Sequence, residues 1–363
     1  MSPKDEEQEP QRGERLTIND IARLANVSKR TISRVINRSP LTKQETREKV
    51  LAVIEKYGFV PDPQARGLAF RRSFLIGLIY DNPNAQYMAD VQQGILDGIR
   101  RTGYALVVYP CRRNDDGFVE DVRAYIEQQK LCGVILPPSS SEDERLVAML
   151  NEVECPYVRI ASVSLDIPTS MVVSHDEKGG VEAAHYLASL GHQLIGHITG
   201  PPTFRSSHER QKGFEQGLAE RGLQLDARYT MQGAYTFESG VACGKQLLSL
   251  DPRPTAIFAG NDEMAAGVYR AAHEAGLDIP DDLSVIGFDD SPIVLKVWPP
   301  LTSVLLPVRD MGRIAARKLT AVVQDGPGTE IEKYYLTPAL VIRQSTTIPA
   351  PTPTPPPKKS EKK

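Results

Sequence analysis

Apolar residues near the start of the chain recur every three or four positions. Three short windows show this spacing: Ile18, Ile21, Ala22 and Ala25; Ile32, Val35 and Ile36; and Val50, Val53, Ile54 and Tyr57. This period is that of an α-helix with one buried face. We therefore predict three short helices that share a small core, the third of which ends at Gly58.

Capping residues mark where these helices begin. Thr17 and Asp20 have the spacing of a capping box, and so do Thr42 and Glu45. Ser28 is suited to cap the second helix. Two short helices joined by a tight turn predict a helix-turn-helix within an all-α head.

From residue 74 onward the pattern changes to short apolar runs that alternate with helical stretches. The apolar runs, each expected to form a buried strand, cover residues 74–80, 104–109, 133–137, 194–200, 255–260 and 283–288. Helical stretches lie between them, at 85–102, 117–129, 177–190 and 206–221. This alternation predicts an α/β core of two doubly wound parallel-sheet subdomains. Ligands in such folds bind beyond the carboxyl ends of the strands, so we expect a site in the cleft between the two halves.

Charge is distributed unevenly along the chain. Residues 15–72 carry 13 Lys and Arg against 5 Asp and Glu, a net charge of +8, whereas the rest of the chain carries −11. The whole-chain value of −3 hides this contrast. A small basic head predicts a polyanionic partner, double-stranded DNA; the alternative is a solvated basic face without a ligand.

The second predicted helix carries the residues best placed to contact DNA. Lys29 and Arg30 lie in its first turn, and Arg34 lies one turn later on the same face. Arginine matches guanine O6 and N7 bidentately, so we expect base reading here. The polar residues assigned to the same DNA-binding surface are Thr17, Ser28, Thr31, Ser33 and Asn37. Such groups bind phosphates and fix the register; the alternatives are a solvent-facing side chain or, for Ser28, a helix cap.

Residues 61–73 follow the head and are interpreted as a hinge helix and linker. Pro63 can begin a short helix, but about eight residues form only a marginal helix in water. We expect it to fold on DNA, with Leu68 entering a minor-groove step and Ala65 and Ala69 beside it. The alternative is an ordinary linker whose Leu68 packs on the core.

The segments TINDIARLANVSKRTISRVIN, TREKVLAVIEKYGFVPD and ARGLA resemble the head of the LacI/GalR family of bacterial repressors. The resemblance covers roughly residues 16–346. It implies a helix-turn-helix head, a hinge helix and a core of the type I periplasmic-binding-protein architecture, in a dimer or tetramer. By this resemblance Lys29, Arg30 and Arg34 occupy base-reading positions, and Leu68 is the hinge leucine.

These patterns and the resemblance together divide the chain into five parts. The parts are a disordered extension at 1–15, the DNA-binding domain at 16–60, the hinge and linker at 61–73, the effector-binding and dimerisation core at 74–346, and a disordered Pro- and Lys-rich tail at 347–363. The expected subdomains of the core are about 74–174 with 303–333, and about 175–302 with 334–346.

Polar residues at or near predicted strand ends supply candidates for the cleft. Carboxylates, amides, an arginine and an aromatic face suit a polyhydroxylated ligand, because each hydroxyl needs a donor or an acceptor. The candidates are Asp81, Asn82, Tyr87, Arg210, Tyr235, Asn261 and Asp289. The resemblance places four of them at effector-contacting positions of sugar-responsive members: Arg210, Tyr235, Asn261 and Asp289. The alternatives are helix capping for Asn261 and Asp289, and an ion pair between Arg210 and Asp289.

Other classes of protein lack support in the sequence. GxGxxG after the first strand, GxxxxGK[ST], GxSxG and HExxH are missing, so we expect neither an enzyme nor a bound cofactor. The four cysteines are far apart and form no Cys/His cluster, which argues against a metal site. No apolar run approaches a membrane span and residues 1–15 contain no signal peptide, so we expect a cytoplasmic protein that acts on the nucleoid.

Together the patterns predict a homodimeric transcriptional regulator that binds a pseudo-palindromic operator and represses carbohydrate-utilisation genes. A sugar-like effector would close the cleft, disorder the hinges and release the operator. One alternative is a purine-type repressor, in which the ligand tightens DNA binding. Another is a sugar transport receptor, which would have no use for residues 17–72.

Overall fold

The computed structural model of the protein describes residues 16–36, 41–59, 73–326, 334 and 336–349. The chain divides into two compact units, the first ending at residue 74 and the second beginning at residue 75. Each unit has a hydrophobic core of its own.

The first unit is a bundle of three helices, α1 (Ile18–Leu24), α2 (Lys29–Ile36) and α3 (Gln44–Tyr57). Its buried core is drawn from the apolar faces predicted above: Ile21, Ala22, Ala25, Ile32, Val35 and Val50. Gly58 ends α3 at φ +60°, in the left-handed region that glycine adopts without strain. The expected all-α head is confirmed.

The start of α1 is fixed by the predicted capping box. Thr17 donates to Asp20 Oδ2 from its Oγ1 at 2.6 Å and from its backbone amide at 2.9 Å, and the Asp20 amide donates back to Thr17 Oγ1 at 3.4 Å. The bonds from Thr17 hold the pKa of Asp20 below its usual value. The second predicted capping box, at Thr42, is wrong, because α3 begins later, with Lys43 at its N-cap.

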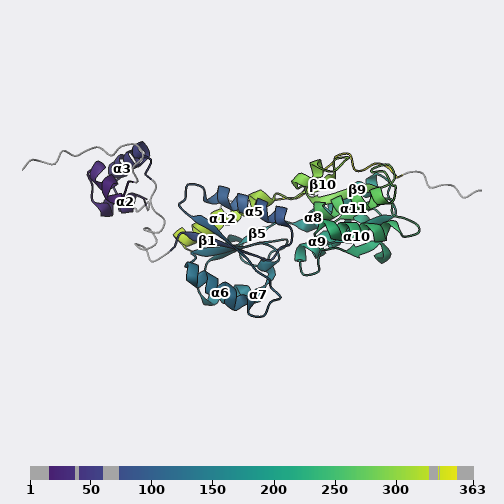
Figure 1. Ribbon diagram of the computed structural model, residues 1–363, viewed down its shortest axis with the longest axis horizontal. Helices are drawn as coiled ribbons and strands as arrows, with labels where there is room; N and C mark the ends of the chain where they lie inside the picture. The colour runs from purple at the N-terminus through teal and green to yellow at the C-terminus, as the bar shows by residue number, and fades with distance from the viewer. Residues whose placement is uncertain (1–15, 37–40, 60–72, 327–333, 335, 350–363) are drawn as a thin grey trace, which may run out of the picture. The chain divides into compact units, whose positions relative to one another are not determined.

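The first sheet of the second unit is parallel, with the strand order β2-β1-β3-β4-β5. Its elements are β1 (Leu75–Tyr80), α5 (Ala85–Ile99), β2 (Ala105–Pro110), α6 (Phe118–Gln129), β3 (Gly133–Leu136), η1 (Ser140–Glu142), α7 (Glu144–Glu152), β4 (Tyr157–Ala161), η2 (Pro168–Ser170) and β5 (Met171–Val173). Figure 1 shows α5 and the later helix α12 (Val308–Asp325) on one face of this sheet, and α6 and α7 on the other.

The second sheet has the order β11-β10-β9-β8-β6-β7 and is parallel except for its edge strand β11. Its elements are α8 (Asp176–Ser189), β6 (Ile195–Thr199), α9 (Arg205–Ala219), η3 (Ala227–Tyr229), β7 (Thr230–Gln232), α10 (Phe237–Leu248), β8 (Ala256–Ala259), α11 (Asp262–Glu274), β9 (Ser284–Asp289), η4 (Pro292–Leu295), β10 (Thr302–Leu305) and β11 (Ala339–Val341). Helix α8 packs against α9, and α10 against α11. Two parallel-sheet subdomains are therefore present, as predicted.

The chain crosses between these subdomains after β5, after β10 and once more between α12 and β11, which lies in the second sheet. β10 pairs with β9 in the second sheet, so the crossing expected at residue 303 comes after Leu305. α12 then returns to the first subdomain, where it packs on α5. A Cβ on Gly94 of α5 would lie 2.0 Å from the carbonyl oxygen of Arg309, so this close approach of the two helices requires glycine.

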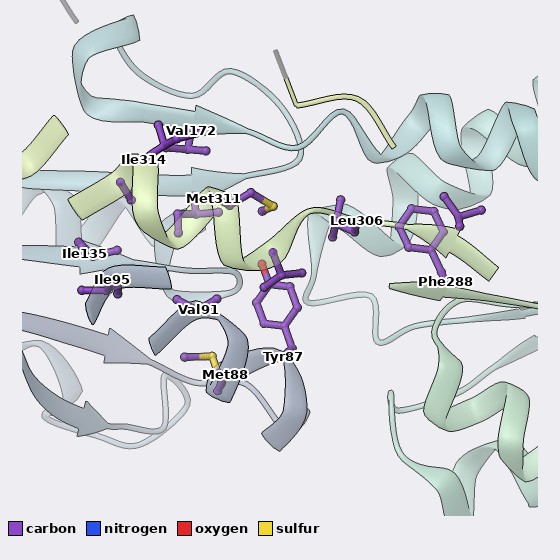
Figure 2. Packing of buried hydrophobic residues seen from close by; sticks show 14 of the residues in the cluster. Tyr87, Met88, Val91, Ile95, Ile135, Val172, Phe288, Leu306, Met311 and Ile314 are labelled. Atoms are coloured by element: carbon purple, nitrogen blue, oxygen red, sulfur yellow. The ribbon is translucent and has the colours of Figure 1, made fainter. Parts of the chain in front are cut away.

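One hydrophobic cluster continues from the first subdomain into the second. Figure 2 shows Val91 of α5 on the side of that helix toward α12, and Met88 of α5 and Met311 of α12 belong to the same cluster. Leu306, at the crossing, and Phe288, at the end of β9, belong to the same cluster. The two subdomains therefore share apolar contacts next to the cleft.

Candidate functional site

A pocket opens between the two subdomains, at the carboxyl ends of their strands, where the sequence predicts a ligand site. The space between its walls, counted together with open solvent at the mouth, is about 380 Å³. It is lined by Asn82, Asn84, Tyr87, Pro138, Ser174, Asp176, Phe204, Ser206, Arg210, Tyr235, Asn261, Asp289 and Leu306. This lining contains every predicted effector residue except Asp81, and three of them, Asn82, Asn261 and Asp289, follow or end a strand.

Arg210, on α9, is a buried cation in the wall of this pocket. Its Nε donates to Asp176 Oδ1 at 2.8 Å, and its Nη2 donates to Asp289 Oδ1 at 3.3 Å. Its Nη1 donates to the carbonyl of Gly260. The guanidinium also lies 3.8 Å from the ring centroid of Phe288. These contacts fix the cation in one orientation.

Two carboxylates share this one cation. Burial opposes the charge of Arg210, but Asp176 and Asp289 outweigh burial and raise its pKa. Burial, and after it the charge of Asp176, raise the pKa of Asp289 to about 7 against the lowering effect of Arg210. The raised pKa of Arg210 follows from its two acidic partners, whereas that of Asp289 follows mainly from burial, because one cation shared with Asp176 does not offset it. The group therefore carries excess negative charge when both acids are ionised.

Two predicted pocket residues, Tyr235 and Asp289, have positive backbone φ angles of +60° and +104°. Residues other than glycine rarely adopt such angles, which cost about 1–3 kcal/mol and gather at binding sites. Tyr235 lies against Gly200, where a Cβ would come within 2.1 Å of the tyrosine ring. Its ring meets Phe204 edge-on at 5.4 Å between centroids. The two rings give one wall of the pocket an apolar surface.

Asn261 lines the pocket, but its polar atoms have partners within the protein. Its Oδ1 accepts from the amide of Met264 at 2.9 Å, which makes Asn261 the N-cap of α11. Its Nδ2 donates to the carbonyl of Tyr235 at 3.1 Å. The structure thus shows the capping role given above as the alternative. A ligand contact would use the remaining amide hydrogen and lone pair.

The residues that follow β1 have different surroundings. Asn82 lines the pocket and donates from Nδ2 to the carbonyl of Pro138 at 3.1 Å. Asp81 lies outside the lining, a correction to the prediction: its Oδ2 accepts from the amide of Arg113 at 3.1 Å and lies 3.8 Å from that guanidinium. Successive side chains of an extended segment point to opposite sides, so both cannot face the pocket. Tyr87 lines it, and burial followed by the charge of Asp176 raises its pKa.

Asp176, the carboxylate that lies nearest to Arg210, was not among the predicted residues. Asp176 begins α8 just after β5, so it satisfies the same strand-end rule as the other candidates. The strand β5 has only three residues and did not stand out as an apolar run. Ser174 donates from Oγ to Asp176 Oδ2 and lines the pocket as well.

The first unit carries the candidate DNA-binding surface. Its described members are Thr17, Ser28, Lys29 and Arg30, which are exposed, and Thr31, Ser33 and Arg34, which are half-buried. Ser28 Oγ accepts from the amide of Thr31 at 3.1 Å and so caps α2. Lys29 and Arg30, in the first turn of that helix, are exposed to solvent. Asn37, Ala65, Leu68 and Ala69 lie outside the described residues.

The described part of the chain was also compared with the requirements of a metal site and of a membrane-spanning helix. No group of three His, Cys, Asp or Glu side chains in these ranges is placed to hold a metal ion. Within the same ranges, no helix is both long enough and apolar enough to cross a membrane.

Comparison with known proteins divides the chain in the same way. Residues 17–62 match the family described as bacterial regulatory proteins, lacI family, and residues 184–346 match a periplasmic binding protein-like domain. The probable HTH-type transcriptional repressor ExuR of Bacillus subtilis is 33% identical over 91% of this chain and 98% of its own length.

Two solved structures are similar to this chain over nearly its whole length. The complex of the transcriptional regulator CelR with cellobiose is 31% identical, with a TM-score of 0.68, over 91% of this chain and 100% of CelR. The lac repressor dimer bound to operator and the anti-inducer ONPF is 28% identical, with a TM-score of 0.70, over 92% of this chain and 100% of that one. The expected fold class, a helix-turn-helix head with two α/β subdomains, is confirmed. The chain belongs to the lacI family of bacterial regulatory proteins and is a DNA-binding transcriptional regulator.

Proposed function

We propose that this regulator is a homodimeric repressor of carbohydrate-utilisation genes, released from its operator by an uncharged sugar. The observation that carries the proposal is the buried group formed by Arg210, Asp176 and Asp289, beside the ring of Tyr235. All three residues belong to the second subdomain, and the first subdomain lines the same pocket with Asn82, Tyr87 and Pro138, so a ligand there would contact both. The protein acts by binding and not by catalysis, on DNA in the bacterial cytoplasm.

The chemistry of the pocket suits a ligand with several hydroxyl groups. A guanidinium donates and an ionised carboxylate accepts, so neighbouring hydroxyls can each find a partner. Phe204 and Tyr235 offer an apolar wall to the C–H face of a sugar ring. Arg210 is the one cation among the described lining residues, and its charge is already shared by two acids. An acidic sugar or a sugar phosphate would therefore meet net repulsion.

The DNA side of the proposal rests on α2. Its first turn presents Lys29 and Arg30 to solvent, where a helix in the major groove reaches base edges. Arginine reads guanine bidentately, so we expect a G·C pair in each half-site. One such head contacts little DNA, so two heads on a pseudo-palindromic operator are needed for specificity. The minor-groove role of Leu68 remains part of the proposal.

The relatives support both halves of this scheme. CelR has been solved with cellobiose, and the lac repressor has been solved as a dimer on its operator. By analogy we assign a sugar to the pocket of this chain and a dimer to its operator complex. The coupling between the two sites requires only about 1–3 kcal/mol of differential affinity.

A thermal-shift screen of the full-length protein tests the ligand class. Matched sets of each aldose, its uronic acid and its 6-phosphate would be compared. We expect stabilisation by one or more neutral sugars, of about 4–8 °C at concentrations far above Kd. Asp289→Asn should remove this shift, and Asp226→Asn, at an exposed ion pair with Arg228, should leave it in place. Stabilisation only by the acids or phosphates would overturn the proposal.

A second candidate is corepression by a purine. The observation that favours it is the pair of rings at Phe204 and Tyr235, which could pack against a planar base. The sign of the DNA response separates the two candidates. A sugar inducer weakens operator binding, whereas a purine corepressor strengthens it.

A further inference from the structure

Helix α9 begins beside the pocket without a capping side chain of its own. Its N-cap is Phe204, whose apolar ring cannot accept a hydrogen bond. The first amide of the helix, on Arg205, instead donates to Glu142 Oε2 at 2.9 Å. Glu142 belongs to η1 of the first subdomain, so the helix is capped across the cleft. A carboxylate at this position also lies favourably at the positive end of the helix dipole.

A second hydrogen bond crosses the cleft close by. Arg113 donates from Nη2 to the carbonyl of Thr203 at 3.2 Å. Arg113 is itself held in place by Asp81, through its amide and its guanidinium, and its carbonyl accepts from Arg145 Nη2 at 3.2 Å. Asp81, which does not line the pocket, therefore braces a side chain that bridges the two subdomains.

The two contacts are made by the residues immediately before and after a residue of the pocket. Phe204 lies between Thr203 and Arg205 in sequence, and its side chain lines the pocket. Farther along α9, Ser206 and Arg210 line it too. Closing the two contacts therefore fixes the start of the helix that carries the central cation.

These contacts favour the closed cleft only weakly, because opposing free-energy contributions nearly balance. The bond to Arg205 and the helix dipole favour closure. Burial opposes it and raises the pKa of Glu142, and among the described residues Oε1 of Glu142 has no hydrogen-bond partner. The balance leaves a contact that can form and break as the cleft moves.

We propose that Glu142 and Arg113 form a clamp that holds the cleft closed by capping α9 from the opposite subdomain. Glu142 then acts as a positioning residue for Arg210, although it does not belong to the pocket lining. The biological role of the clamp rests on the proposed function, in which the cleft closes over a ligand and the clamp would hold that closed state. Its existence can be tested without any effector.

The test is hydrogen exchange of the full-length, unliganded protein, resolved at the Arg205 amide. Exchange of a protected amide reports how often its hydrogen bond opens. We expect Glu142→Ala to speed exchange about three- to tenfold, as expected for the loss of a charged helix cap. Glu142→Gln should have a smaller effect, because an amide oxygen still accepts but brings no charge.

Arg113→Ala distinguishes a clamp formed by both residues from a helix cap supplied by Glu142 alone. Arg113 does not touch the Arg205 amide, yet its removal should speed exchange there if both contacts hold one closed state. Glu152→Ala is the control, because Glu152 pairs only with Arg123 on the same subdomain in the described structure. Faster exchange in Glu142→Ala but not in Arg113→Ala would overturn the clamp. So would unchanged exchange in both variants, whatever sugar the pocket binds.

Discussion

One residue of the pocket, Asp289, carries a charge that changes near neutral pH. Asp289 has a pKa of about 7, so it is roughly half protonated in the unliganded protein at that pH. An ionised carboxylate accepts hydrogen bonds from hydroxyls, and binding of a hydroxylated ligand would favour that form. Ligand binding and proton release are therefore linked at this residue.

We expect about half a proton to be released for each sugar bound at pH 7, and almost none at pH 8.5, given the pKa of about 7. Calorimetric titration in buffers of different ionisation enthalpy measures this number directly. Asp289→Asn should abolish the release if the variant still binds. Binding that is independent of buffer at pH 7 would show that Asp289 does not accept from the ligand.

His197 provides a separate pH effect, on stability. It is fully buried on β6, stacked on Phe258 at 5.0 Å between centroids, and its Nδ1 hydrogen-bonds with the Phe258 carbonyl at 2.9 Å. Burial lowers its pKa from 6.5 to about 4. Between these values the unfolded chain binds a proton that the folded chain does not. The contribution of His197 to stability is therefore fully present above pH 6.5 and is lost as the pH drops toward 4.

Between pH 6.5 and pH 4 the wild type should lose about 3 kcal/mol more unfolding free energy than His197→Gln, from the shift in the pKa of His197. Urea denaturation of both proteins across this range measures the difference. The comparison isolates His197, because the other titrating groups are the same in the two proteins. Identical pH slopes for the two proteins would contradict the assignment.

Six of the thirteen residues that line the pocket were predicted from the sequence, and the failures have physical causes. Asp289 was found because an apolar run marked a strand end, and Arg210, which lies within a helix, because the resemblance marked its position. Asp176 was missed because β5 is too short to be recognised as a strand. Asp81 was misplaced because a strand end does not reveal which of two successive side chains faces the pocket.

At the scale of elements, α2 combines a packed face and an exposed face in eight residues. Ile32 and Val35 are buried in the head, which fixes the helix against α1 and α3. Its first turn remains exposed, with Lys29 and Arg30 side by side. The packing holds the reading surface at a set angle before DNA is bound.

Arg30→Ala should relax sequence preference at one base position of each half-site, at a cost of about 1–3 kcal/mol there. Binding to a randomised operator library, followed by sequencing, gives the preference at each position. Lys49→Ala, at an exposed cation of α3, is the matched control and should change affinity evenly across sequences. An equally even loss in Arg30→Ala would mean that Arg30 contacts only phosphate.

The predictability of elements follows their length and burial. The three head helices were predicted from their apolar period, and the predicted strands include β3 and β8, whose four residues are all buried. β4, β7 and β10 were not identified, because polar residues interrupt their apolar runs, and β11 offers only three residues of pattern. Their pairings depend on partners that are distant in sequence, which no local window contains.

At the scale of the whole molecule, regulation must connect a pocket in one unit to a DNA-binding surface in the other. The second unit is suited to move, because its subdomains are joined only where the chain crosses between them, after β5, after β10 and between α12 and β11. Leu306 and Phe288 share one apolar cluster beside the cleft (Figure 2), so closure would repack a continuous surface. A ligand shifts such an equilibrium only by its difference in affinity for the two states.

The most direct test of this account is operator affinity with and without sugar. A preferred operator is selected from random DNA, and binding of the full-length protein is followed by fluorescence anisotropy during titration with neutral sugars. The account predicts that at least one neutral sugar raises the operator Kd by about 5- to 150-fold, and that Asp289→Ala loses this response. An operator Kd that no sugar changes, or an equal response in Asp289→Ala, would contradict it.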